Sequence, residues 1–130
     1  MRTSGILMHI TSLPSPHGVG TMGAAARDFV DFLQAAGQTW WQLLPICPTS
    51  FGDSPYQTFS TFAGNPYLID LDDLRDEGLL EREEYEGLCW GADPLRVDYG
   101  LLYRQRYPIL RRACKRLLAA PAPGYAAFCE

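Results

Sequence analysis

The sequence has 130 residues, of which 47% are hydrophobic and 12% aromatic, and this suits one globular domain with an apolar core. Its net charge of -4 argues against a nucleic-acid-binding protein, and no apolar run approaches the roughly 20 residues that a membrane-spanning helix needs. The four cysteines lack C-x-x-C spacing and no signal peptide is recognisable, so we expect no zinc site and free thiols in the cytoplasm.

The first elements along the chain are predicted to be a strand, a helix and a second strand. Residues 6–10 are a short apolar run and predict a buried strand. Residues 24–36 predict a helix, because Phe29 and Leu33 lie on one apolar face at helical spacing. Residues 39–44 predict another buried strand. This order indicates a βαβ unit with two parallel strands and a right-handed crossover.

Each predicted strand is followed by a long loop. Residues 11–23 and residues 45–66 are rich in Gly, Pro, Ser and Thr and show no helical or strand periodicity. A loop of about twenty residues without regular structure is uncommon and is usually functional. Parallel α/β folds bind ligands at the carboxyl ends of their strands, so both loops are candidate sites.

The second half of the sequence predicts short elements followed by one long helix. Residues 67–71 predict a third strand, and residues 72–77 and 81–86 predict two short acidic helices. Residues 100–118 predict a helix with a break or kink at Pro108. Beyond that proline, the predicted apolar stripe consists of Leu110, Ala113, Cys114, Leu117 and Leu118.

Charge is concentrated in two segments of this half. Residues 70–86 hold nine of the fifteen acidic residues, and residues 104–116 hold six of the eleven basic residues. We interpret both as solvent-exposed surfaces, the basic one being the wet side of the long helix.

One βαβ unit cannot bury both faces of its strands, so the sequence requires more sheet than it contains. The last residues are apolar and lack a helix cap, from which we expect a truncated reading frame or an engineered fragment. The isolated 130-residue chain is expected to aggregate or to be molten, because its strands have open edges.

The loop at residues 45–66 has a composition that suits a carbohydrate. Aromatic rings can stack on the C–H faces of a sugar, and Asp, Ser and Gln side chains can bond its hydroxyl groups. Many ordered loops carry the same residues for packing and turn formation, so composition alone leaves both interpretations open.

Several motifs, in this order, resemble those of amylomaltases and disproportionating enzymes, glycoside hydrolase family 77 of the α-amylase clan. The motifs are SGILMH at 4–9, TSLP at 11–14, WQLLP at 41–45, GDSPYQ at 52–57, FAGNPYLID at 62–70 and VDYG at 97–100. The similarity extends from about residue 4 to residue 107. The motifs at 52–57 and 62–70 together are highly specific.

The resemblance implies an α/β fold that is the N-terminal part of a (β/α)8 TIM barrel. Residues 1–71 would supply the first two strands and the first helix with the glucan-binding loop 45–66, and residues 72–130 would begin an inserted helical subdomain. The implied activity is a 4-α-glucanotransferase, which transfers α-1,4-glucan segments between maltooligosaccharides or starch-like glucans through a retaining double displacement.

The family's catalytic carboxylates lie downstream of this sequence, so no catalytic residue is assigned and the chain alone is predicted to be inactive. Neither a metal nor an organic cofactor is implied, because two carboxyl groups suffice for retaining transfer. The implied partner is an α-1,4-glucan or maltooligosaccharide, without nucleic acid or membrane, and no oligomeric state is predicted.

Four residues of the loop are candidates for substrate binding. Tyr56 matches the family tyrosine that packs against the sugar beside the nucleophile, and Ser54 matches a serine lining the same cleft. Ser54 could equally shape a turn, and Asp53 could form a turn or accept a hydrogen bond behind the site. Phe51 stands where many members have the tyrosine of a secondary glucan site, so it keeps the ring but lacks the hydroxyl.

Other polar and aromatic residues are given structural interpretations. His9, at the end of the first strand, is predicted to be a structural histidine with its polar atoms satisfied. His17 is predicted to face solvent, and Asn65 is predicted to initiate a turn before a proline. Trp40 and Trp41 are adjacent in a strand and therefore should pack on opposite faces of the sheet.

Two other functions remain open at this stage. The first is a hydrolase of the same clan, such as an α-amylase, which would give only shorter products where a transferase also makes longer ones. The second is a glucan-binding module without catalysis.

Overall fold

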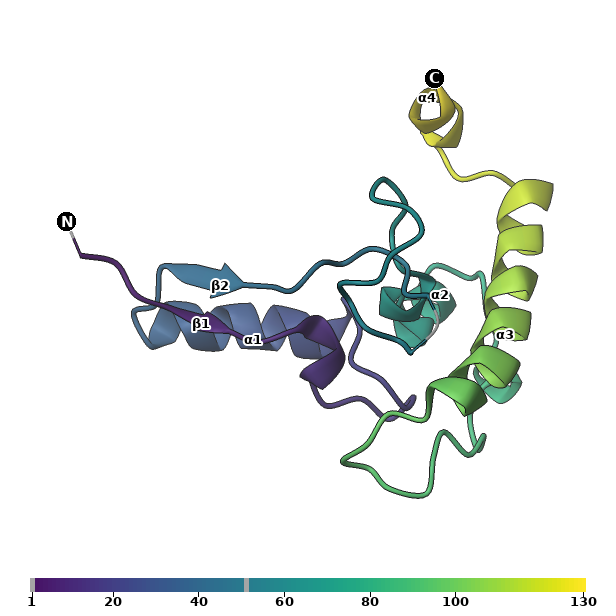
Figure 1. The fold of residues 1–130 in the computed structure, drawn as a ribbon. Helices are drawn as coiled ribbons and strands as arrows, with labels where there is room; N and C mark the ends of the chain where they lie inside the picture. The colour runs from purple at the N-terminus through teal and green to yellow at the C-terminus, as the bar shows by residue number, and fades with distance from the viewer. Residues whose placement is uncertain (1, 51) are drawn as a thin grey trace.

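A computed structural model describes residues 2–50 and 52–130 (Figure 1). The strands and α1 lie at one end of the molecule, and α2, η3 and α3 lie at the other. The elements in chain order are β1 (Gly5–Leu7), η1 (Ile10–Ser12), α1 (Ala24–Ala35), β2 (Trp40–Gln42), η2 (Pro66–Leu68), α2 (Leu71–Asp76), η3 (Arg82–Glu84), α3 (Tyr99–Ala119) and α4 (Tyr125–Cys129).

The predicted βαβ unit is confirmed. β1 and β2 form a parallel two-stranded sheet in which Ile6 is paired with Trp41, and α1 connects the two strands. Both strands are shorter than predicted. At the end of the first strand, the chain turns into the 3-10 helix η1 at Ile10. After α1, Gly37 adopts a φ of 69°, a left-handed conformation that glycine allows at the end of a helix.

Only one face of this sheet is covered within the described residues. Phe29 of α1 packs edge-on against Trp41, with ring centroids 4.9 Å apart. The fully buried members of this small core are Ile10, Leu13, Ala26 and Leu68. Trp40 is 63% exposed and Leu7 is 59% exposed, so the adjacent tryptophans do differ in environment, as the alternation of strand side chains predicts.

The strand predicted at residues 67–71 is wrong, because two side chains begin helical turns there. The Asn65 side chain accepts a hydrogen bond from the Tyr67 N–H at 3.0 Å and starts η2. The Asp70 carboxylate accepts bonds from the N–H groups of Asp72 and Asp73, at 2.9 and 3.1 Å, and starts α2. Asx side chains favour such N-cap positions, and here they override the apolar run.

Of the break or kink predicted at Pro108, the break is wrong, because the long helix α3 continues through this residue, and the kink remains a prediction. Its buried residues are Leu102, Arg106, Ile109 and Ala113, so the buried stripe begins earlier than predicted. Cys114 and Leu118, which the sequence assigned to that stripe, are exposed. Packing against the core on both sides of Pro108 outweighs the loss of one backbone hydrogen bond at the proline.

The main apolar core lies beneath α3. Its buried members are Val19, Tyr67, Leu71, Leu80, Tyr85, Trp90, Leu102, Ile109 and Ala113. Val19 comes from the loop after β1, so this loop packs into the helical region. The predicted division of the chain at residue 71 remains a prediction.

The oppositely charged segments partly pair with each other. Glu84 of η3 contacts Arg116 of α3 at 2.5 Å and Arg112 at 3.1 Å. The predicted acidic helix at residues 81–86 is reduced to the single 3-10 turn η3.

All four cysteines are free, and among the described residues no helix has the length and apolarity needed to cross a membrane.

Candidate functional site

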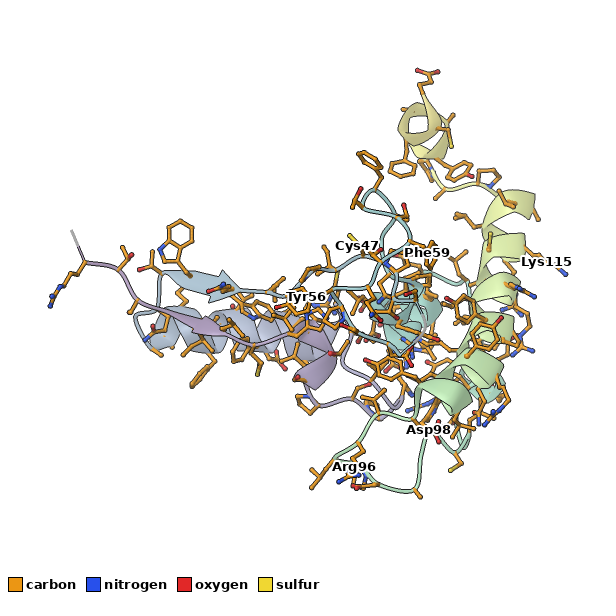
Figure 2. The ribbon with its side chains drawn as sticks, in the orientation of Figure 1. Cys47, Tyr56, Phe59, Arg96, Asp98 and Lys115 are labelled. Carbon is orange, nitrogen blue, oxygen red and sulfur yellow. The ribbon has the colours of Figure 1, made fainter. Side chains whose placement is uncertain are left out.

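The loop at residues 45–66 is closed at two levels. At its base, the Asn65 N–H donates to the Ile46 carbonyl oxygen at 3.1 Å. Further out, Thr49 and Thr58 form an isolated antiparallel bridge, which separates residues 49–58 from the rest of the loop. Figure 2 shows Tyr56 and Phe59 on this loop, between the strands and α3. The described residues of the loop before η2 therefore have a defined shape although they form no helix or named strand.

The motif at residues 52–57 forms a tight turn inside this bridge. The Ser50 N–H donates to Gln57 O at 2.8 Å, and the Gln57 N–H donates to Ser54 O at 3.0 Å. Gly52 and Asp53 have φ values of 87° and 53°. Glycine reaches this left-handed region freely, and aspartate enters it more readily than most residues. This conformation favours the turn-forming interpretation of Asp53.

The structure places Tyr56 and Ser54 side by side on the turn. Tyr56 is 70% exposed, so its ring face is available to a ligand. The Ser54 hydroxyl accepts a hydrogen bond from the Tyr56 N–H at 3.3 Å, which gives Ser54 a turn-shaping role. Its O–H remains able to donate elsewhere. Phe51 lies outside the described residues.

The charge of Asp53 acts on the tyrosines beside the loop. Burial, the neighbouring Tyr107 and the charge of Asp53 raise the pKa of Tyr67 to about 12. Burial and then the charge of Asp53 also raise the pKa of Tyr99. Both phenols therefore stay neutral near pH 7, and Asp53 supplies the negative charge on this side of the loop.

An aromatic cluster supports the base of the loop. Tyr67 lies two residues after Asn65 and is 6% exposed. Its ring centroid lies 5.8 Å from that of Tyr99 and 5.7 Å from that of Tyr107, both on α3. Aromatic pairs at such distances stabilise by about 0.5–1.5 kcal/mol beyond the area that they bury. The loop is thus attached to the most densely packed part of the chain.

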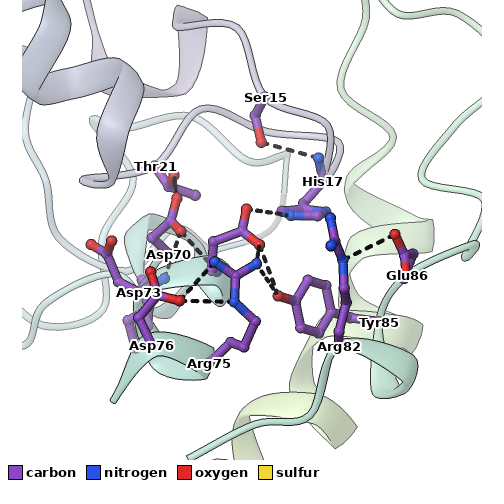
Figure 3. Close-up of polar contacts among 12 residues, drawn as sticks. Ser15, His17, Thr21, Asp70, Asp73, Arg75, Asp76, Arg82, Tyr85 and Glu86 are labelled. Carbon is purple, nitrogen blue, oxygen red and sulfur yellow. Dashed lines mark hydrogen bonds and ion pairs between the residues drawn. The ribbon is translucent and has the colours of Figure 1, made fainter. Parts of the chain in front are cut away.

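The other candidate loop, at residues 11–23, is bound to α2 through His17 (Figure 3). The prediction that His17 faces solvent is wrong, because it is only 9% exposed. Its Nε2 lies 3.0 Å from the Asp72 carboxylate, which also accepts from the Tyr85 hydroxyl at 2.8 Å and from Arg75 at 2.7 Å. His17 and Asp72 are 55 positions apart, so no local pattern could reveal their contact.

Two contacts bind the same loop to Asp70, one from the Thr21 side chain and one from the backbone at Gly23. The Thr21 hydroxyl donates to the Asp70 carboxylate. At Gly23, a Cβ atom would collide with the Asp70 side chain, so glycine is required for this close approach. The Asp70 carboxylate is thereby committed to structure, since it also caps α2.

Arg106 corrects the prediction of a uniformly wet basic face on α3. It is fully buried, and its guanidinium donates to the Ile69 carbonyl oxygen and to the His17 carbonyl oxygen, the latter at 3.4 Å. Burial lowers the pKa of Arg106 to about 10. The sequence carried a signal for this burial, because Arg106 lies four residues after Leu102 and three before Ile109.

His9 also differs from its prediction. It precedes η1 at the end of β1, and its Nδ1 atom is buried with no hydrogen-bond partner among the described residues. Its polar atoms are therefore not all satisfied. Burial lowers the pKa of His9, so its ring is neutral near pH 7.

The loop after β1 and residues 88–97 line an open hollow of about 700 Å³. Of the predicted binding residues that the structure describes, neither Tyr56 nor Ser54 nor Asp53 lines it. In the described part of the chain, no three His, Cys, Asp or Glu side chains are arranged to hold a metal ion.

Comparison with known proteins gives one consistent result. A family model described as 4-alpha-glucanotransferase matches residues 8–130. A curated 4-alpha-glucanotransferase of Streptococcus pneumoniae serotype 4 is 54% identical over 115 residues, which cover 88% of this chain and 23% of the relative. The Thermus thermophilus 4-alpha-glucanotransferase is 50% identical over 133 residues, 99% of this chain and 26% of the relative. The chain thus spans about a quarter of the length of these relatives.

A solved structure agrees with these sequence matches. The amylomaltase from Streptococcus agalactiae in complex with acarbose superposes with a TM-score of 0.90 at 50% identity. The match covers 93% of this chain and 24% of that protein.

Proposed function

Because this chain belongs to the 4-alpha-glucanotransferase family, glycoside hydrolase family 77, we propose that it forms the glucan-holding part of such an enzyme. The enzyme would transfer α-1,4-glucan segments between maltooligosaccharides or starch-like glucans. The parallel β1–β2 pair would be the first two strands of a TIM barrel, and α2 to α3 would belong to the inserted subdomain.

The observation that carries this proposal is the exposed ring of Tyr56 on a rigid turn. The turn follows β2, and His9 follows β1, so both lie beyond the carboxyl ends of paired parallel strands. Ligand sites of α/β barrels are built at that edge. Tyr56 offers a stacking face, and Ser54 and Asp53 offer hydroxyl and carboxylate oxygens close to it.

Retaining transfer needs a nucleophile and an acid/base carboxyl group about 5 Å apart. Four of the partly buried acids have other roles, Glu84 through its ion pairs with Arg112 and Arg116. Asp70 caps α2, Asp72 binds His17 and Arg75, and Asp73 binds Arg27 through two hydrogen bonds. We therefore assign the catalytic carboxylates to a part of the enzyme that these 130 residues do not span.

Binding of maltotetraose to the 130-residue chain tests the proposal, measured by NMR with cellotetraose as the β-linked control. We expect saturable shifts of the Tyr56 backbone amide with maltotetraose alone. Removing the stacking ring in Tyr56→Ala should weaken binding about three- to tenfold, the effect of one aromatic contact. Phe59→Ala is the matched control, because Phe59 is a 74% exposed ring on the same loop.

Equal loss in both variants, or equal binding of both tetrasaccharides, would overturn the assignment of Tyr56 as a specific glucan contact. The same chain incubated with maltotriose should give no product. A ladder of longer oligosaccharides would show catalysis within these residues, and shorter products alone would support a hydrolase.

A further inference from the structure

We infer that His9 is a second glucan contact, which donates a hydrogen bond from its Nε2 atom to a sugar oxygen. This inference rests on the proposed function and assigns to it a residue on the other strand of the sheet. It starts from the unpartnered ring nitrogen at the carboxyl end of β1.

The backbone around His9 is held in place on both sides. The Met8 N–H donates to Gln42 O at 3.1 Å, and the Met8 carbonyl oxygen accepts from the Trp41 indole N–H at 2.7 Å. The His9 carbonyl oxygen accepts from the Ser12 N–H at 3.0 Å and closes η1. The His9 side chain makes no cap hydrogen bond to that helix. Its position is therefore set by the sheet, while its ring is left free for another partner.

The buried Nδ1 atom determines where the ring carries its proton. A buried N–H group without an acceptor is rarer in proteins than an acceptor without a donor. Since Nδ1 has no partner among the described residues, the proton belongs on Nε2. A neutral ring is also favoured, because protonation would add an unsatisfied N–H at Nδ1, and burial lowers the pKa of His9. The half-buried ring then presents one donor, at Nε2.

The sheet places His9 and the start of the loop that carries Tyr56 at the same edge. β1 and β2 end together, with Leu7 paired to Gln42. His9 lies two residues beyond Leu7, and the loop that carries Tyr56 starts three residues beyond Gln42. A sugar has ring and hydroxyl oxygens that accept hydrogen bonds beside its C–H faces. One glucan chain can therefore stack on Tyr56 and accept from His9.

The chain offers a direct measurement, because it contains only two histidines. Long-range ¹H–¹⁵N spectra of the ¹⁵N-labelled chain at pH 7 report the protonated nitrogen of each ring. We expect the Nε2–H form for His9. On titration with maltotetraose, the His9 ring signals should shift at the same concentrations as the Tyr56 amide. His17 serves as the internal control, because its Nε2 is already bonded to Asp72.

Two substitutions provide an independent measurement. His9→Phe keeps a ring of similar size without nitrogen and should weaken maltotetraose binding about three- to tenfold, the range for one neutral hydrogen bond. His9→Gln keeps an N–H donor and should therefore lose less affinity for maltotetraose than His9→Phe.

The possible outcomes separate this inference from the proposed function. Shifts of Tyr56 without shifts of the His9 ring, or an Nδ1–H tautomer, would overturn the role of His9 and leave the proposed function standing. Equal affinity of His9→Phe and the unsubstituted chain would do the same. If neither Tyr56 nor His9 responds, the proposed function fails for this chain, and the role of His9 fails with it.

Discussion

The βαβ unit at residues 5–42 and the helical region at residues 66–119 differ in how far their apolar side chains are buried. All β1 and β2 residues except Trp41 are exposed, and among the described residues the sheet is covered on one face, by α1 and the small core around Ile10. In the helical region, by contrast, Leu71, Leu102 and Ile109 are at most 1% exposed. The sheet half presents surface that other chain segments could cover, while the helical half already contains a dense core.

This difference indicates where the stability of the described chain resides. Burying a large aliphatic side chain stabilises by about 1.5–3 kcal/mol. Such burial is concentrated beneath α3. Because Tyr67 joins the loop base to that core, the candidate binding loop is anchored to the helical region although it follows a strand of the other region.

The largest expected effect comes from emptying the helical core. Leu102→Ala should lower the free energy of unfolding by about 2–5 kcal/mol, because it leaves a cavity at a fully buried site. Leu7→Ala is the matched control in the sheet half and should change stability by less than about 0.5 kcal/mol. Urea denaturation measures both, and a cooperative transition of a monomeric sample would contradict the expectation that the isolated chain is molten. Similar losses in the two variants would contradict the contrast between the regions.

A smaller loss is expected at the buried cation of α3. Arg106→Ala removes the donor to two carbonyl oxygens, those of His17 and Ile69. An unsatisfied buried acceptor costs about 1–3 kcal/mol, so we expect a loss of about 2–4 kcal/mol in urea denaturation. Arg106→Lys keeps the charge without the planar fork and should recover part of it. An Arg106→Ala chain as stable as the original would show that the buried guanidinium contributes nothing.

Acid should weaken the contact between the loop after β1 and α2. Burial alone would raise the pKa of Asp72, but hydrogen bonds from Tyr85 and His17 and the charge of Arg75 together lower it below its ordinary 3.8. A carboxyl group with a lowered folded pKa stabilises above its unfolded pKa, and this contribution is lost as pH falls through the folded pKa.

Stability measured from pH 6 to pH 2.5 should therefore fall below about pH 4, where unfolded aspartates bind protons. Asp72→Asn removes the titrating group and should flatten part of this slope. An unchanged slope in that variant would exclude Asp72 as a source of the acid sensitivity.

The smallest effect on stability is expected at the candidate site itself. Tyr56 is 70% exposed, so Tyr56→Ala should change the free energy of unfolding by less than about 0.5 kcal/mol, although it weakens glucan binding. Thermal denaturation and a binding titration of the same variant separate its effect on stability from its effect on binding. A large stability loss would mean that the tyrosine supports the loop rather than a ligand.

Local patterns predicted the parts of the fold that depend on local physics. Helical spacing around Phe29 and Leu33 predicted α1, and two apolar runs flanking it predicted the parallel strands. The apolar run at residues 67–71 led to a wrong strand prediction, because the capping side chains of Asn65 and Asp70 start helical turns there. Attention to those two Asx residues would have corrected it.

The candidate site was predictable in its motif and less so in its surroundings. The motif at residues 52–57 was identified from its sequence, and the roles of Tyr56 and Ser54 in binding remain predictions. His17 was placed wrongly because its partner Asp72 is distant in the sequence. The unpartnered Nδ1 of His9 depends on what surrounds the end of β1 in space, which no spacing rule encodes.

The three tryptophans provide optical probes of the two regions. Trp90 is 8% exposed in the helical core beside His17, whereas Trp40 is 63% exposed on the sheet. Indole emission moves to longer wavelength as water reaches the ring. A chain that keeps only Trp90 should therefore emit at shorter wavelength than one that keeps only Trp40. Covering the open sheet face would shift the Trp40 emission alone, so fluorescence can follow completion of that face without any label.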